Sequence, residues 1–230
     1  MTPVTQHLAA EIERVHPPNP VALAGYNART RPECIMSAVR KPKLRAVEYL
    51  ALEKRAAFKS EFFDGEMFAM AGASRAHNRV NENLSGELHA RLKGGPCQSF
   101  SRDLRVLIDR TGLYCYPDLV IVCGEPEYAA VDADTLVNPR VVVEVLSEST
   151  ERYDRTTKFR HYQQLDSLRE YILVAQDEPL CERFVRLESG EWAVESFVGL
   201  DAALELRSVP MQVPLADIYA GVTFSTPPKR

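Results

Sequence analysis

The chain has 230 residues, 45% of them hydrophobic and 26% charged, with 28 basic and 32 acidic side chains and a net charge of −4. Enough apolar residues are present for a core that needs no metal or disulfide support, which excludes disorder of the whole chain. The acidic balance excludes a general attraction to nucleic-acid phosphates, so such contacts would require local basic patches or metal ions.

The cysteines and the termini indicate the cellular compartment. The chain lacks an apolar run of about 18 residues, and its N-terminus lacks the pattern of a secretory signal. We therefore expect a cytoplasmic protein with no membrane partner. The cysteines are odd in number and form no CxxC pair, so we expect them to be reduced and mostly buried. They are Cys34, Cys97, Cys115, Cys123 and Cys181.

The first 42 residues differ in composition from the rest because six prolines interrupt them. Prolines at this density oppose helices and sheets, so we expect residues 1–42 to be a disordered extension. Met36 is a candidate for the natural start of the chain. Residues 43–230 are expected to form a single domain.

The first predicted elements are a helix over 46–56, a hairpin and a longer helix. Val47, Leu50 and Ala51 share one face of the first helix. Asp64-Gly65, between two aromatic arms within 61–70, is typical of a tight hairpin turn. The apolar stripe of Val80, Leu84, Leu88 and Leu92 then predicts a helix over 74–92 that packs on a sheet, and Gly94-Gly95 predicts its end.

The remaining elements suggest a mixed fold. Strands are expected over 100–108, 118–122 and 140–146, the last buried on both faces, with a loop over 124–139. A helix over 151–165, with Phe159 and Tyr162 facing the core, precedes a strand over 171–175. A hairpin over 181–187 and 192–198, a strand over 204–209 and a short helix over 215–219 complete an α/β (α+β) fold.

Two carboxylates interrupt strongly apolar strands. Asp118 follows Tyr-Pro and precedes Leu-Val-Ile-Val, and Glu144 lies within Val-Val-Val-Glu-Val-Leu. Ionised carboxylates are rarely buried without a partner, so neighbouring strands would bring these two together as an oxygen-rich site for Mg²⁺. The alternative is that each pairs with an arginine at a strand end. Asp154 and Lys158 share one face of the next helix, where a surface ion pair is the ordinary explanation.

Together, the motifs Tyr-Pro-Asp118, Val-Val-Val-Glu144-Val-Leu-Ser, Asp154-x-x-x-Lys158 and Leu168-Arg-Glu-Tyr-Ile-Leu-Val resemble the Uma-two family of restriction-endonuclease-like proteins, in the PD-(D/E)XK nuclease superfamily. The resemblance extends from about Val47 to Val222. It implies a core of a helix, three strands, a helix and a strand, with β-hairpins added at both ends.

The resemblance also implies a reaction. Asp118 and Glu144, with the main-chain carbonyl of Val145, would bind Mg²⁺, with Mn²⁺ as a substitute. Lys158 matches a lysine that has migrated to the next helix, because Glu144-Val145 is followed by Leu146 and not by lysine. The implied activity is endonucleolytic hydrolysis of DNA phosphodiester bonds by metal-activated water. Duplex cleavage requires two active sites, so a homodimer is expected.

Several further residues are auxiliary candidates. His77 would reach the site or a phosphate, although a surface or capping histidine is the commoner case. Glu61 and Glu66 flank the hairpin turn, where either would join the metal shell, although exposed hairpin carboxylates are the commoner case. Asp103 is expected to form an ion pair with Arg105 beside the site, and Asp154 accompanies Lys158.

Two other function classes are weighed. The first is a non-catalytic nucleic-acid-binding module that uses Arg75, Arg79 and Arg91 of the long helix. The second is a glycoside hydrolase built on the carboxylate pair, which ranks last because Trp192 is the single tryptophan.

Overall fold

The computed structural model describes residues 43–70, 72–101 and 103–224. The expectations for residues 1–42 and for Cys34 lie outside these residues. Among the helices described, none is both long enough and apolar enough to cross a membrane.

The core of the fold is a six-stranded sheet in the order β12-β11-β10-β9-β6-β3. In this sheet β9 and β10 are parallel, and the other neighbouring pairs are antiparallel. The strands are β3 (Cys97–Ser101), β6 (Leu119–Cys123), β9 (Val141–Val145), β10 (Glu170–Val174), β11 (Leu180–Arg186) and β12 (Trp192–Val198). All five residues of β9 are buried, as its unbroken apolar run predicts.

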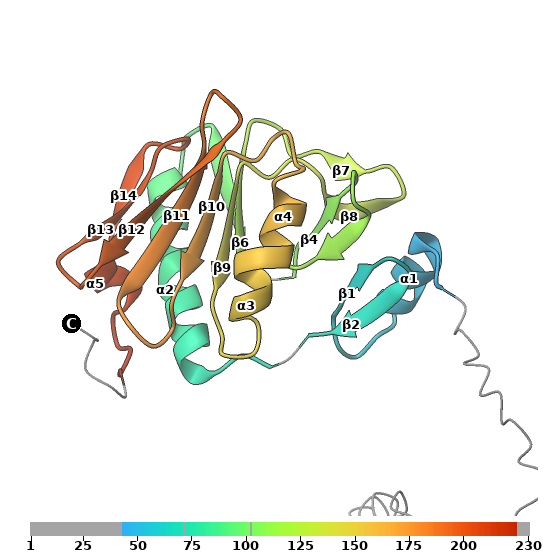
Figure 1. Ribbon diagram of the computed structural model, residues 1–230, viewed down its shortest axis with the longest axis horizontal. Helices are drawn as coiled ribbons and strands as arrows, with labels where there is room; N and C mark the ends of the chain where they lie inside the picture. The colour runs from blue at the N-terminus through green and yellow to red at the C-terminus, as the bar shows by residue number, and fades with distance from the viewer. Residues whose placement is uncertain (1–42, 71, 102, 225–230) are drawn as a thin grey trace, which may run out of the picture. The chain divides into compact units, whose positions relative to one another are not determined.

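The helix α2 (Arg75–Leu92) covers one face of this sheet, behind it in the view of Figure 1. The predicted stripe is confirmed, because Val80, Leu84, Leu88 and Leu92 are all buried against alternate residues of β6 and β9. At the helix start, the hydroxyl of Ser74 accepts the N–H of His77 at 3.0 Å. The same face is completed by β13 (Ala203–Leu206), β14 (Met211–Pro214) and α5 (Leu215–Ile218).

The opposite face carries a helix that is not α-helical throughout. It consists of α3 (Glu151–Tyr153), the π-helical segment η2 (Asp154–Lys158) and α4 (Phe159–Tyr162), in front of the sheet in Figure 1. Phe159 and Tyr162 are buried in a second apolar cluster with Val142 and Leu173, as predicted. The helix ends at Tyr162, three residues before its predicted end.

A second six-stranded sheet, in the order β2-β1-β5-β4-β8-β7, borders this cluster. The predicted hairpin about Asp64-Gly65 is confirmed, and β1 also pairs with β5 through Phe62 and Tyr114. The elements are α1 (Ala46–Glu53), β1 (Ser60–Phe63), β2 (Glu66–Ala69), β4 (Arg105–Ile108), β5 (Leu113–Cys115), β7 (Tyr128–Ala129) and β8 (Asp132–Leu136).

Three of the expected elements are wrong in detail. The strand over 100–108 is divided between β3 of one sheet and β4 of the other, because the chain changes sheets there. The loop over 124–139 contains the β7–β8 hairpin, whose polar strands carry no apolar alternation. The first helix buries Tyr49, Leu50 and Glu53 and leaves Val47 half exposed, because Tyr49 and Leu50 pack in a cluster with residues of the second sheet.

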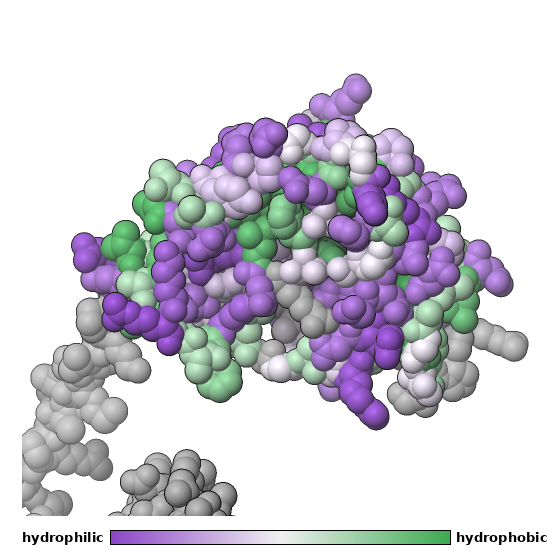
Figure 2. Space-filling view, turned by 180° about the vertical axis from the view of Figure 1, so that it is seen from behind, coloured by the Kyte–Doolittle hydropathy of each residue, from purple (hydrophilic) through white to green (hydrophobic). Residues whose placement is uncertain are grey.

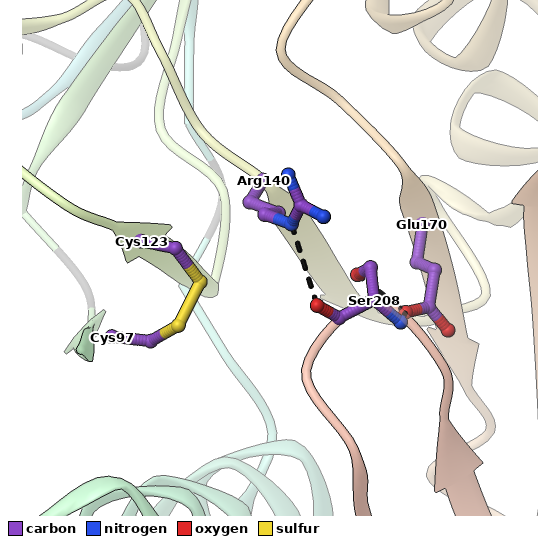
Figure 3. Close-up of a disulfide and its surroundings, with 5 residues drawn as sticks. All are labelled: Cys97, Cys123, Arg140, Glu170 and Ser208. Atoms are coloured by element: carbon purple, nitrogen blue, oxygen red, sulfur yellow. Dashed lines mark hydrogen bonds between the residues drawn. A yellow bond between two sulfur atoms is a disulfide. The ribbon is translucent and has the colours of Figure 1, made fainter. Parts of the chain in front are cut away.

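The prediction of reduced cysteines is also wrong. Cys97 and Cys123 face each other across β3 and β6 and form a disulfide (Figure 3). The remaining described cysteines, Cys115 and Cys181, are free and buried, as expected. Strand pairing joins residues that lie 26 positions apart, a spacing that no short cysteine motif reveals.

Polar contacts hold the chain after β13 against the core sheet. Ser208 donates from its N–H and its hydroxyl to the buried Glu170 of β10, each at 2.6 Å. The carbonyl of Ser208 accepts a bond from Arg140 Nε at 3.4 Å, just before β9 (Figure 3). Glu170 is therefore satisfied by the N–H groups of Arg207 and Ser208 and by the hydroxyl of Ser208. Figure 2 shows the reverse face of the molecule, where hydrophilic residues predominate and hydrophobic residues occur in separate patches.

Candidate active site

Asp118 and Glu144 lie at neighbouring positions on two adjacent strands. In the antiparallel pair β6–β9, Leu119 faces Val143, so Asp118, just before β6, comes opposite Glu144. Asp118 Oδ2 accepts the N–H of Val145 at 2.8 Å and thereby continues the strand pairing with a side chain. The two acids therefore meet at one end of the core sheet.

Glu144 is buried, with 4% of its surface exposed. Alternation along β9 directs it away from α2 and toward the helix on the other face. There its Oε1 lies 2.8 Å from Lys158 Nζ and accepts the hydroxyl of Tyr162 at 3.0 Å. Burial raises the pKa of Glu144 to about 8, even though the positive charge of Lys158 opposes the shift.

Lys158 is shared by three carboxylates. Its Nζ lies 3.2 Å from Glu61 and 3.7 Å from Asp154, in addition to Glu144. Asp154 and Lys158 are both buried within η2, so the explanation of a surface ion pair is wrong. Burial alone would lower the pKa of Lys158, but the facing carboxylates outweigh it and hold that pKa well above its ordinary value.

The cluster carries more acid than its single ammonium can neutralise. With all groups ionised, three carboxylates and one lysine would leave two negative charges in a buried space. Burial raises the pKa of Asp154, as it does that of Glu144, which reflects this excess. A divalent cation would relieve it.

The hairpin supplies one acid to the site and not the other. Glu61 is buried, and its Oε2 accepts the hydroxyl of Tyr153 at 3.3 Å, so the expectation of an exposed carboxylate is wrong at this position. Glu66 is exposed on β2, as a hairpin carboxylate is expected to be. The register of the hairpin puts both side chains on the same face, since Glu66 pairs with Phe63, so the difference lies in what covers them: Glu61 contacts Tyr153 and Lys158.

The predicted pair between Asp103 and Arg105 does not form. Asp103 is exposed and forms an ion pair with Lys59. Arg105 is buried and binds Asp132 and Thr135 of β8 and the hydroxyl of Tyr116. Because β4 and β8 are parallel neighbours, Arg105 meets partners that lie far away in the sequence.

Two residues of α2 contact Asp118 from the other face of the sheet. His77 Nε2 lies 3.3 Å from Asp118 Oδ2, so His77 reaches the site and does not occupy a surface position. Asn81 Nδ2 donates to Asp118 Oδ1 at 3.4 Å. Asn81 was not predicted, although its spacing of four from His77 places both on one helical face. Tyr153 and Tyr162, which contact Glu61 and Glu144, were also missed as site residues.

The available donors suit a hard divalent cation. Between residues 43 and 224, apart from 71 and 102, no three His, Cys, Asp or Glu side chains form a ready metal-ligand cluster. Two carboxylates and a main-chain carbonyl are nevertheless an all-oxygen set, and Mg²⁺ usually retains several waters as its remaining ligands. The excess negative charge around Lys158 also fits a cation, so the residues present fit the group.

The fold and site together define a class of protein. A helix, three strands, a helix and a parallel fourth strand, with acids on the second and third strands, form a restriction-endonuclease-like core. A crystal structure described as a putative nuclease belonging to DUF820, from Anabaena variabilis, matches this fold with a TM-score of 0.63 and 17% identity. The match covers 76% of this chain and 97% of that one.

The sequence comparisons identify the family. Residues 46–216 match the Uma2 family, described as "Putative restriction endonuclease". The chain therefore belongs to the Uma2 family. The uncharacterized protein slr1290 of Synechocystis sp. is 36% identical over 183 residues, which cover 80% of this chain and 95% of that protein. A second uncharacterized protein of Synechocystis sp., sll1609, is 34% identical over 162 residues, covering 70% and 92% respectively.

Proposed function

We propose that this protein is a metal-dependent endonuclease that hydrolyses DNA phosphodiester bonds, with Mg²⁺ as the cofactor and Mn²⁺ as a substitute. The observation that carries the proposal is the meeting of Asp118, Glu144 and Lys158 from three separate elements, with Lys158 Nζ 2.8 Å from Glu144. Family membership and the nuclease-like fold support a nucleic-acid substrate.

Each site residue has a distinct task in this proposal. The carboxylates of Asp118 and Glu144 and the main-chain carbonyl of Val145 would hold the cation. When bound, a divalent cation supplies charge that offsets the phosphate and lowers the pKa of water. His77 and Asn81 orient the Asp118 carboxylate from α2, while Tyr162 orients that of Glu144.

Lys158 acts as a charge and not as a base. Its raised pKa keeps the ammonium protonated at neutral pH, so it cannot accept a proton from water. It can donate hydrogen bonds that position the attacking water and stabilise negative charge that develops on the phosphate. Glu61 and Asp154 hold the ammonium in place from β1 and η2.

We further propose that residues 43–230 form the catalytic domain and that two copies act together, because a double-strand cut requires two sites. Light scattering at micromolar concentration tests the dimer, and a monomer there would contradict it.

The decisive experiment incubates plasmid DNA and single-stranded DNA with purified protein in Mg²⁺, Mn²⁺ or EDTA. Cleavage by the wild type should require the metal and should be lost in Asp118→Asn and in Lys158→Met. Asp166→Asn is the matched control, because Asp166 is an exposed carboxylate whose ion pair, among the residues that the structure describes, is with Arg110. Cleavage retained in Asp118→Asn would refute the site.

The same experiment addresses the binding-module alternative. Retained, salt-sensitive DNA binding with no cleavage in any divalent metal would favour it. Of its three candidate arginines, Arg91 is already engaged, because its guanidinium contacts Glu87 and the carbonyl of Gln212.

A further inference from the structure

A pocket of about 580 Å³ lies beside the site, outside the acidic cluster. Its walls are the 54–59 loop, which joins α1 to β1, and residues of the β7–β8 hairpin, and its floor includes Tyr116 and Arg105. This volume falls within the range of about 300–1,000 Å³ that is usual for small-molecule sites. The pocket therefore has room for one base and its sugar.

Two aromatic rings stand at this pocket with unusual exposure. Phe58 is 82% exposed, the most of the large hydrophobic residues described, and Tyr128 is 43% exposed. Phe58 therefore buries little of its ring in the core and leaves that ring accessible to a ligand. Exposed rings of this kind are the platforms on which proteins stack unpaired bases.

The charges of the pocket favour a neutral ligand. Three cations line it, and three carboxylates balance them: Lys54, Lys59 and Arg105 with Glu53, Asp103 and Asp134. The cations are partly engaged already, since Lys59 pairs with Asp103 and Lys54 Nζ lies 2.9 Å from Asp132. A free phosphate would meet no net positive charge here. A nucleobase, which is flat and uncharged and carries both donors and acceptors, matches the lining better.

The chain connects this pocket directly to the site. Lys59 on its wall is two residues before Glu61, and Tyr116 on its floor is two residues before Asp118. Two residues span at most about 7 Å, which is about the rise of two stacked bases. A strand with its phosphate at Asp118 and Glu144 would therefore bring a base one or two nucleotides away to the pocket.

We propose that this pocket receives one unpaired base of the substrate strand by stacking on Phe58 and Tyr128, so that the protein prefers single-stranded or locally unpaired DNA. The inference deepens the proposed function and rests on it, because the ligand is the substrate of that nuclease. A paired base cannot enter without leaving the duplex, which requires unpairing energy.

Binding and cleavage are measured separately to test it. Fluorescence anisotropy in EDTA compares a fluorescein-labelled single-stranded oligonucleotide with its duplex, for wild type, Phe58→Ala and Phe68→Ala. Phe68 is the matched control, an exposed phenylalanine on β2 outside the pocket. Phe58→Ala should weaken single-strand binding at least about fivefold, or about 1 kcal/mol. Duplex binding should change less than about twofold, and Phe58→Trp should restore the single-strand affinity.

The outcomes separate this inference from the proposed function. If Phe58→Ala and Phe68→Ala bind single strands equally, or if wild type does not prefer single strands, the base pocket is refuted, while metal-dependent cleavage would still establish the nuclease. If Phe58→Ala alone loses single-strand affinity but no metal supports cleavage by wild type, the pocket stands and the nuclease proposal fails. Because Phe58 is almost fully exposed, misfolding would not explain a loss.

Discussion

Replacing Lys158 by methionine tests the buried cluster more directly than any other change. Methionine keeps the length and most of the volume of the side chain but removes the ammonium shared by Glu61, Glu144 and Asp154. Lys158 and all three acids are less than 10% exposed, and their contacts with Nζ span 2.8 to 3.7 Å. Removing one partner of such a buried pair costs about 3–5 kcal/mol when the remaining charge stays ionised.

The cost should depend on pH in a definite direction. Without the ammonium, the pKa values of Glu144 and Asp154 in the folded state rise further above their unfolded values. The folded protein then binds more protons than the unfolded chain, so stability falls as pH increases. We expect Lys158→Met to cost about 1 kcal/mol at pH 5, where the carboxyl group of Glu144 is protonated, and about 3–5 kcal/mol at pH 8.

Urea unfolding in EDTA, followed by circular dichroism at pH 5 and pH 8, measures both values. Lys93→Met, which removes an exposed lysine after α2, should change stability by less than about 0.5 kcal/mol at either pH. An equal loss at both pH values for Lys158→Met would refute the shared-ammonium argument. In Mg²⁺, DNA cleavage by this variant should fall by about 10²- to 10³-fold.

Three further predictions concern Glu144, the packing of α2 and the disulfide. Glu144→Gln should flatten the decline in stability of the metal-free protein between about pH 4.5 and 8. The pKa of Glu144 in the folded protein is about 8, so over this range the folded protein keeps a proton that the unfolded chain releases. An unchanged pH profile in urea unfolding would count against this. Leu84→Ala should lower the free energy of unfolding by about 2.7–5 kcal/mol, because Leu84 of α2 is fully buried against the core sheet. A loss below about 1 kcal/mol would contradict that packing. Cys123→Ser should lower the free energy of unfolding by about 2–4 kcal/mol in oxidising buffer, since it removes the disulfide to Cys97. Dithiothreitol should abolish most of this difference from wild type, and equal stability without reductant would show that the disulfide does not form.

Local patterns in the sequence were sufficient to predict the framework that carries the site. The stripe of leucines in α2, the valine run of β9 and the Asp64-Gly65 turn each encode one element through contacts within a few residues. Asp118 and Glu144 stood out for a related reason, since a carboxylate inside an apolar strand requires a partner. These features depend on periodicity and burial, which neighbouring residues reveal.

Only the tertiary structure decided which partners meet. Glu61 comes to Lys158 from another sheet, Asn81 reaches Asp118 across the core, and Cys97 bonds with Cys123 through strand pairing. The π-helical segment that buries both Asp154 and Lys158 has no signature in the spacing of four, which also suits a surface ion pair. The sequence by itself therefore determined α2, β9, the β1–β2 hairpin and the two conspicuous acids. The packing of distant elements decided the rest, because contact energies between them depend on register and chain crossing, and a local pattern contains neither.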